Sequence, residues 1–125
     1  MATILLSIKP EYVAKIFDQT KKYEYRKRVP KRPVEKVVVY SSGQEQQVVG
    51  EFEVLETIKM KPTSLWNTTK NVAGITKAKF QEYFHDCETA YAFRIGNTVL
   101  YETPKKLNEY GVYNAPQSFS YLEEG

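Results

Sequence analysis

The sequence has only one cysteine and one histidine, Cys87 and His85, in 125 residues. A lone cysteine excludes an internal disulfide, which fits a reducing cytoplasm. No second Cys or His exists to complete a zinc tetrad, and no carboxylates are spaced as in a calcium-binding loop, so we expect neither a metal nor a cofactor. A Ser–His–Asp triad would have to use His85, which lies beside Asp86 at the end of a predicted helix. A surface histidine is the better interpretation.

Long hydrophobic runs and phosphate-binding glycine motifs are also missing. No apolar run approaches the roughly 20 residues of a membrane helix. The N-terminus has neither the basic region nor the apolar length of a signal peptide. Neither GxGxxG nor a P-loop is present, so a nucleotide-fold enzyme has no support. The length, with 42% hydrophobic and 26% charged residues, predicts one globular domain over residues 1–125. The single cysteine predicts that this domain is cytoplasmic.

The net charge of +3 conceals an uneven distribution. Residues 21–36 hold eight Lys/Arg and two Glu, a net charge of +6, so the rest of the chain carries a net charge of −3. The chain is also rich in aromatic residues, with ten Tyr, six Phe and one Trp. A local basic segment with many aromatic side chains favours a nucleic-acid or nucleotide partner. The alternative is a solvated charged face on a protein whose tyrosines serve as strand residues.

Hydrophobic periodicity predicts the secondary structure of the first half. Residues 4–8 form a short apolar run typical of a buried strand. Pro10 and Glu11 suit the first turn of a helix whose apolar residues recur at helical spacing. Further strands are predicted over residues 22–28, 37–40 and 48–60. Because 13 residues is long for a strand, we expect a bend or bulge in the last of these, at Gly50 or Glu56.

The second half continues the mixture of helix and strand. One helical turn is predicted after Pro62, and Thr76 is a candidate N-cap for a second amphipathic helix. Residues 90–95 alternate, and Gly96-Asn97 is a favoured hairpin turn into a strand over residues 98–101. The tail after Pro104 is rich in loop residues. About six strands with two or three short helices, not interleaved regularly, predict an α+β fold built on a curled sheet or barrel.

The basic segment contains the candidate site residues. Glu24, Arg26 and Arg28 fall on one face of the predicted strand, where the arginines could grip phosphates bidentately. A carboxylate within a basic cluster stays ionised, and Glu24 could orient an arginine, accept from a base edge or act as a general base. The alternative is that Glu24 and Arg26 are only neighbours on a strand. Lys27, Lys31 and Arg32 are expected to form a solvated, salt-sensitive rim.

Residues 19–26, with the sequence QTKKYEYR, resemble the signature of the ASCH domain, a branch of the PUA-like superfamily. The family pattern is Gly-x-Lys-x-x-Glu-x-Arg, and Lys21, Glu24 and Arg26 match its charged positions. Gln19 stands where the family has Gly, which suggests a changed loop before Lys21, although Gln can adopt the left-handed conformation at some cost. The segments 6–12, 49–54, 90–95 and 116–119 also look like the small prokaryotic members described as predicted regulators.

The resemblance implies a PUA-like β-barrel with flanking helices and a cleft, lined by Lys21, Glu24 and Arg26, that holds RNA or a nucleotide. One branch of the family hydrolyses acetylated cytidine with a Thr three residues after the motif Lys. Glu24 occupies that position here, which puts this activity in doubt. Another branch is reported as ribonucleases, a chemistry in which Lys21 could stabilise phosphorane charge.

Three functions therefore remain open. The first is a non-catalytic RNA- or nucleotide-binding module, serving as a regulator of transcription or translation, in which Lys21, Arg26 and Glu24 hold the ligand. An aromatic would stack on a base, the candidates being Tyr25, Tyr40, Trp66 and Phe119. The second is an enzyme acting on RNA or modified nucleosides, with Lys21 and Glu24 as catalytic candidates. The third is a domain that binds another protein through its acidic faces and basic loop.

Overall fold

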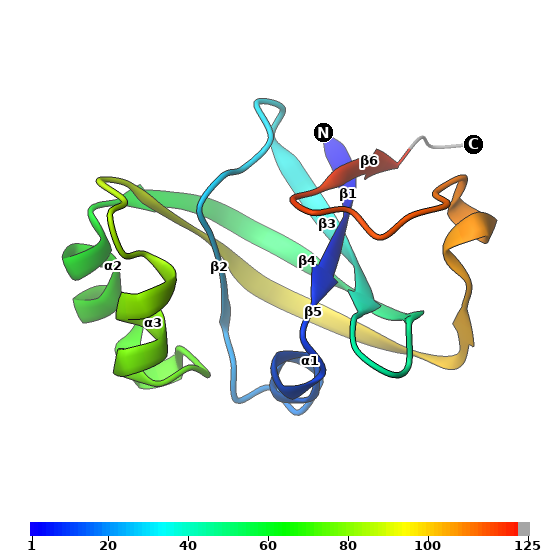
Figure 1. The fold of residues 1–125 in the computed structure, drawn as a ribbon, viewed down its shortest axis with the longest axis horizontal. Helices are drawn as coiled ribbons and strands as arrows, with labels where there is room; N and C mark the ends of the chain where they lie inside the picture. Colours follow the sequence, from blue (N-terminus) through cyan, green and yellow to red (C-terminus); the bar gives the residue numbers. More distant parts are fainter. Residues whose placement is uncertain (123–125) are drawn as a thin grey trace.

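The structure is a computed structural model that describes residues 1–122. Strands and helices alternate irregularly along the chain, as Figure 1 shows. Three α-helices and two 3-10 turns accompany six strands in these residues. The elements are β1 (Ala2–Ile8), α1 (Pro10–Phe17), β2 (Tyr23–Arg26), β3 (Val34–Ser41), β4 (Gln47–Met60), α2 (Pro62–Thr69), η1 (Lys70–Val72), α3 (Lys77–Tyr83), β5 (Ala90–Lys105), η2 (Leu107–Tyr110) and β6 (Ser120–Leu122).

The six strands form one mixed sheet in the order β2-β5-β4-β3-β1-β6. β1 and β3 are parallel, and every other neighbouring pair is antiparallel. The parallel pair needs a crossover, which α1 and β2 provide. Both parallel strands are buried along most of their length, as expected for a strand covered on two faces. The predicted α+β fold is confirmed, with one difference: the sheet curls but does not close into a barrel, because β2 and β6 do not pair.

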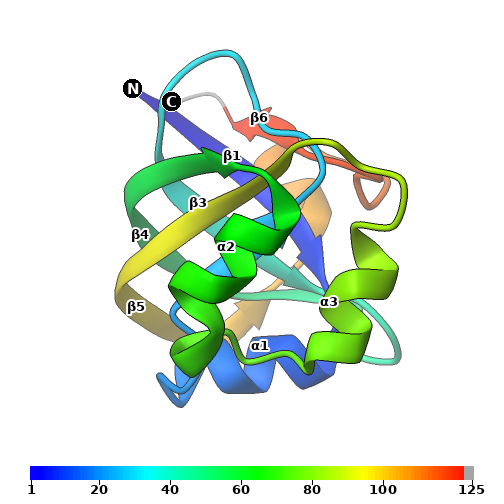
Figure 2. The ribbon, with the colours of Figure 1, turned by 90° about the vertical axis from the view of Figure 1, so that its left-hand side faces the viewer.

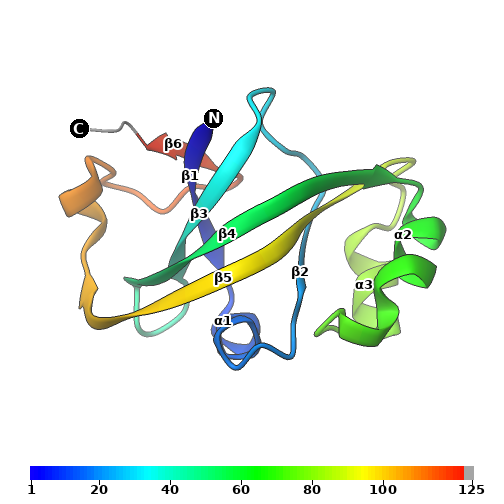
Figure 3. The ribbon, with the colours of Figure 1, turned by 180° about the vertical axis from the view of Figure 1, so that it is seen from behind.

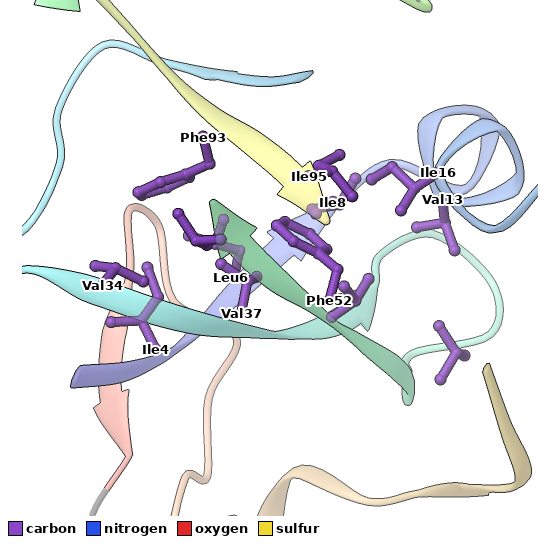
Figure 4. Packing of buried hydrophobic residues seen from close by; sticks show 13 residues of the cluster. Ile4, Leu6, Ile8, Val13, Ile16, Val34, Val37, Phe52, Phe93 and Ile95 are labelled. Carbon is purple, nitrogen blue, oxygen red and sulfur yellow. The ribbon is translucent and has the colours of Figure 1, made fainter. Parts of the chain in front are cut away.

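The main hydrophobic core fills the concave side of the curled sheet. Figure 4 shows it between β1, β3, β4 and β5, with α1 closing one end. Ile4, Leu6, Val37, Phe52 and Phe93 are almost completely buried there. Burying side chains of this size contributes about 1.5–3 kcal/mol each relative to leaving them exposed. A separate cluster packs the two helices α2 and α3 against β2 and the nearby part of β5.

Helices α2 and α3 lie next to each other at one end of the molecule (Figure 2). Thr76 caps α3 as predicted, its side-chain oxygen accepting from the Lys79 amide at 3.2 Å. The helical turn predicted after Pro62 is longer than expected, because α2 continues to Thr69. Within residues 1–122, no helix is long and apolar enough to cross a membrane.

Strand β5 runs without a break through the hairpin predicted at Gly96-Asn97, so that prediction is wrong. Pairing with β4 continues on both sides of this dipeptide, with Ile95 opposite Val54 and Thr98 opposite Phe52. Tertiary pairing has overridden the local turn preference. The two strands form a long, bent ribbon (Figure 3). Its register shifts include those next to Gly50 and Glu56 in β4, which confirms the predicted irregularity there.

Gly50 lies where β4 passes close to β5 and α1. A Cβ at this position would lie 2.4 Å from the Val99 carbonyl oxygen and 2.6 Å from the Phe17 ring. Gly50→Ala should therefore lower the free energy of unfolding, measured by urea denaturation, by about 1–3 kcal/mol. Gly96→Ala is the matched control, because the atoms nearest to its Cβ would belong to the side chains of Glu53 and Leu55 rather than to the backbone. An equal loss in the two variants would contradict this explanation.

Candidate functional site

A cleft of about 480 Å³ opens beside β2, between α1 and α3. The end of β1 forms one side of it, and β2 supplies three charged or aromatic side chains in succession. Both signs of charge are present, together with tyrosines. The lining residues are Ser7, Ile8, Lys9, Glu11, Tyr12, Lys21, Glu24, Tyr25, Arg26, Ile75, Lys79, Glu82 and Tyr83.

A tight loop after α1 directs Lys21 into this region. The carboxylate of Asp18 accepts from the Thr20 amide at 2.8 Å and from the Thr20 hydroxyl at 2.6 Å. Gln19 has a φ of 70°, so it adopts the left-handed conformation that glycine prefers. The Lys21 amide then donates to the Lys15 carbonyl at 3.0 Å. Gln19 therefore makes the left-handed turn that a glycine would make at this motif position.

The Lys21 side chain is buried, with only 2% of the residue exposed. Its Nζ donates to the Ala73 carbonyl at 2.8 Å and lies 4.8 Å from the centre of the Tyr25 ring and 5.2 Å from that of Tyr12. Such contacts with ring faces stabilise a cation that has lost its water. Gly74 makes room for the stem, because a Cβ there would lie 2.4 Å from the Lys21 Cβ.

Burial lowers the pKa of Lys21 to about 8. Glu24 acts in the opposite direction by favouring the charged ammonium, while Lys15 and Arg26 add to the lowering. Carbonyl and ring contacts therefore compensate only part of the cost of removing this amine from water. The amine exchanges its proton closer to neutral pH than an exposed lysine does.

Glu24 and Arg26 form an ion pair on the cleft side of β2. Arg26 Nε and Nη2 lie 3.1 and 3.0 Å from Glu24 Oε2, and Nη2 also donates to the Ser7 carbonyl at 3.0 Å. The side chain of Arg26 is 14% exposed and that of Glu24 is 8% exposed. Among residues 1–122, no protein hydrogen bond engages Glu24 Oε1 or Arg26 Nη1. The pair therefore retains one acceptor and one donor group next to each other.

Tyrosines and a rim of charged residues complete the cleft. Tyr12 and Tyr83 lie on α1 and α3, and burial raises the pKa of both hydroxyls. Lys79 and Glu11 form an exposed ion pair at 3.4 Å that links the two helices across the rim. An exposed pair of this kind adds little stability. The phenol rings thus provide the apolar contact surface, and the β2 pair supplies hydrogen-bonding capacity.

The structure brings together four of the residues singled out from the sequence: Lys21, Glu24, Tyr25 and Arg26 all line the cleft. The other four lie elsewhere. Arg28 is exposed in the loop that follows β2, and Tyr40 is 6% exposed in a third hydrophobic cluster. Trp66 packs on Phe80 with ring centres 5.0 Å apart, and Phe119 on Tyr121 at 5.4 Å. These four residues are not part of the cleft lining.

Sequence reasoning missed the contributions of α1 and α3. Tyr12, Lys79 and Tyr83 line the cleft, although the sequence pattern of their helices does not single them out as site residues. A hydroxyl at the edge of an apolar helix face is a weak indication of such a position. Their meeting with β2 depends on tertiary packing that no local pattern specifies. The described residues contain no group of three or more His, Cys, Asp or Glu that could hold a metal ion.

Known structures share this architecture. The ASCH protein from Zymomonas mobilis superposes with a TM-score of 0.89 and 21% identity, covering 98% of this chain and 89% of that one. A Tyr-to-Phe mutant of the same protein gives 0.90 and 20%, covering 99% and 92%. The N-terminal domain of Staphylothermus marinus McrB is more distant, with a TM-score of 0.52, 12% identity, and 86% and 77% coverage. The chain thus has the fold of an ASCH domain, as its motif indicated.

The chain belongs to the family described as "Domain of unknown function (DUF365)", whose model matches residues 1–115. Two proteins of Ureaplasma parvum contain related segments. "ATP synthase subunit alpha" is 34% identical over 122 residues, and "Large ribosomal subunit protein uL22" is 30% identical over 123 residues. Each match covers 97% of this chain. The chain spans only 15% and 39%, respectively, of the length of those proteins.

The depressed pKa of Lys21 predicts a pH-dependent stability. In the folded protein Lys21 loses its proton near pH 8, whereas in the unfolded chain it keeps the proton until about pH 10.5. Between these values the unfolded state binds more protons, so the free energy of unfolding should rise with pH, by at most about 1.4 kcal/mol per pH unit. Urea denaturation between about pH 8 and 9.5 measures the rise.

Lys21→Met is the control for this experiment, because it keeps a long side chain in the same space and removes the titrating amine. The difference in unfolding free energy between the native chain and this variant should change with pH over that interval. Parallel profiles for the two proteins would show that Lys21 does not have the depressed pKa.

Proposed function

We propose that this protein is an RNA- or nucleotide-binding module of the ASCH type and that the cleft beside β2 holds the ligand. The observation that carries the proposal is the Glu24–Arg26 pair. Its two groups are fixed to each other and to the Ser7 carbonyl, yet they keep one acceptor and one donor at an open cleft. The pair thus retains hydrogen-bonding capacity that its contacts within the fold do not use.

The dimensions and surfaces of the cleft suit a nucleotide. Its volume of about 480 Å³ lies within the usual range of small-molecule sites, which is roughly 300–1,000 Å³. Tyr12 and Tyr83 provide ring surface for contact with a planar base. Glu24 accepts from a base N–H, and Arg26 donates to a base acceptor or a phosphate oxygen. The buried Lys21 contributes indirectly: its ammonium contacts the ring of Tyr25 and adds positive charge to the cleft lining.

As part of the same proposal, the module acts as a regulator by occupying its RNA rather than by changing it. The partly buried Cys87, with no cysteine partner, supports a cytoplasmic setting.

A second candidate is an enzyme acting on RNA or a modified nucleoside, favoured by one observation, the lowered pKa of Lys21. An amine with a pKa of about 8 can take up or release a proton near neutral pH. It ranks second because Lys21 Nζ is directed to the Ala73 carbonyl and enclosed by two rings. Substrate would have to displace those contacts before it reached the amine.

Conservative variants of the ion pair test the binding function. Glu24→Gln removes the charge and keeps the size of the side chain, whereas Arg26→Gln removes the charge and shortens the side chain. Each should weaken binding of nucleoside monophosphates and of short single-stranded RNA by about tenfold. Isothermal titration calorimetry measures both ligands. Glu102→Gln, at an exposed position of β5, is the control and should bind as the native chain does.

Native affinity in both ion-pair variants would overturn the proposal. Incubation of the native chain with labelled RNA and, separately, with acetylated cytidine separates the two candidate functions, with RNA cleavage and loss of the acetyl group as the readouts. Turnover that Lys21→Ala abolishes would favour the enzyme.

A further inference from the structure

The loop between β2 and β3 carries a dense group of cations. Residues 27–33 contain Lys27, Arg28, Lys31 and Arg32 and no acidic residue. All four are exposed, and within residues 1–122 none of them forms an ion pair. This contrasts with the cleft, where Glu11, Glu24 and Glu82 accompany the lysines and Arg26. The electrostatic attraction for an anion is therefore concentrated in the loop (residues 27–33) rather than in the cleft.

One end of the loop adjoins the cleft. Lys27 Nζ lies 5.0 Å from the centre of the Tyr83 ring, and Tyr83 is a wall of the cleft. A ligand that contacts Tyr83 therefore comes within reach of the first cation of the loop.

The other end of the loop borders a second hollow of about 340 Å³. Lys31 and Arg32 lie on its margin, and its other walls are largely apolar, including Val29, Pro30, Val34, Val54, Leu55 and Phe93. Leu55 is 52% exposed there. From Lys27 to Arg32 the chain reaches at most about 18 Å, so the two hollows lie at the two ends of one short basic path.

We infer that the loop is the track for the backbone of single-stranded RNA, which places one base in the cleft and a later base against the second hollow. The inference rests on the proposed function of the cleft and extends it from a nucleotide to a polymer. Unpaired cations that follow one another along a loop suit the repeated charge of a phosphodiester backbone. The cleft, with its tyrosine rings and hydrogen-bonding groups, and the second hollow, with its largely apolar walls, suit unstacked bases, which a duplex does not offer.

RNA length is the first variable of the test. Fluorescence anisotropy should show that an eight-nucleotide single-stranded RNA binds at least about tenfold more tightly than a mononucleotide, measured by competition. Lys31→Gln combined with Arg32→Gln should weaken RNA binding by about tenfold near 0.1 M salt. It should also reduce the slope of log affinity against log salt by about 1.4, while mononucleotide affinity stays within about twofold.

Lys61→Gln combined with Lys70→Gln removes the same charge at the two ends of α2 and is the electrostatic control. Leu55→Ser tests the second hollow and should weaken RNA binding by about fivefold. Leu100→Ser is its control, because Leu100 is 63% exposed and does not line that hollow.

The proposed RNA track would be wrong if the RNA and the mononucleotide bound with equal affinity, or if the loop variant and its control gave equal salt slopes. Neither result would contradict the proposed function of the cleft. If the native chain bound neither ligand, the proposed function of the cleft would fail as well. The inference would also be wrong if an acidic peptide displaced the labelled RNA while the eight-nucleotide RNA bound no more tightly than the mononucleotide. In that case the loop would be a protein-docking segment.

Discussion

The burial of the Lys21 amine is the interaction on which the arrangement of the cleft depends. Lys21 is only 2% exposed, so its ammonium needs contacts that replace those it would make with water. The Ala73 carbonyl and the rings of Tyr12 and Tyr25 provide these contacts. Residues of α1, β2 and the segment before α3 therefore all contact Lys21 Nζ. Gln19 has a left-handed backbone in the loop that leads to Lys21, and the absence of a side chain at Gly74 leaves room for the Lys21 stem. The cleft is therefore built around a charge that the fold removes from water.

Strand β2 connects the candidate site to the core. Tyr25 faces inward, where its hydroxyl lies 2.6 Å from that of Thr69 and its ring packs against Phe80. Glu24 and Arg26, its neighbours in sequence, lie on the opposite face of the strand because successive side chains alternate, and all three residues line the cleft. The packing of Tyr25 thereby fixes the position of the ion pair. In the proposed function the cleft, which contains charges of both signs, selects the ligand by shape and hydrogen bonding, and the exposed cations of residues 27–33 attract its negative charge.

Local pattern was sufficient where a segment decides its own structure. The helix after Pro10, the cap at Thr76 and the long strand ending at Met60 follow from capping chemistry and periodicity. The hairpin expected at Gly96-Asn97 does not form, because β5 pairs with β4 on both sides of the dipeptide and Glu53 accepts from the Asn97 amide at 3.4 Å. Similarly, the spacing of Lys21, Glu24 and Arg26 indicated a site, but only tertiary packing brings Tyr83 to them.

The most direct measurement is a ¹H–¹⁵N nuclear magnetic resonance titration of the labelled protein with a nucleoside monophosphate, alongside one with inorganic phosphate. We expect the nucleotide to shift the amide signals of Lys21, Glu24, Arg26 and Tyr83, and phosphate alone to shift mainly those of residues 27–33. Nucleotide-induced shifts that avoid the cleft, or the same cleft shifts with phosphate alone, would contradict a nucleotide site beside β2.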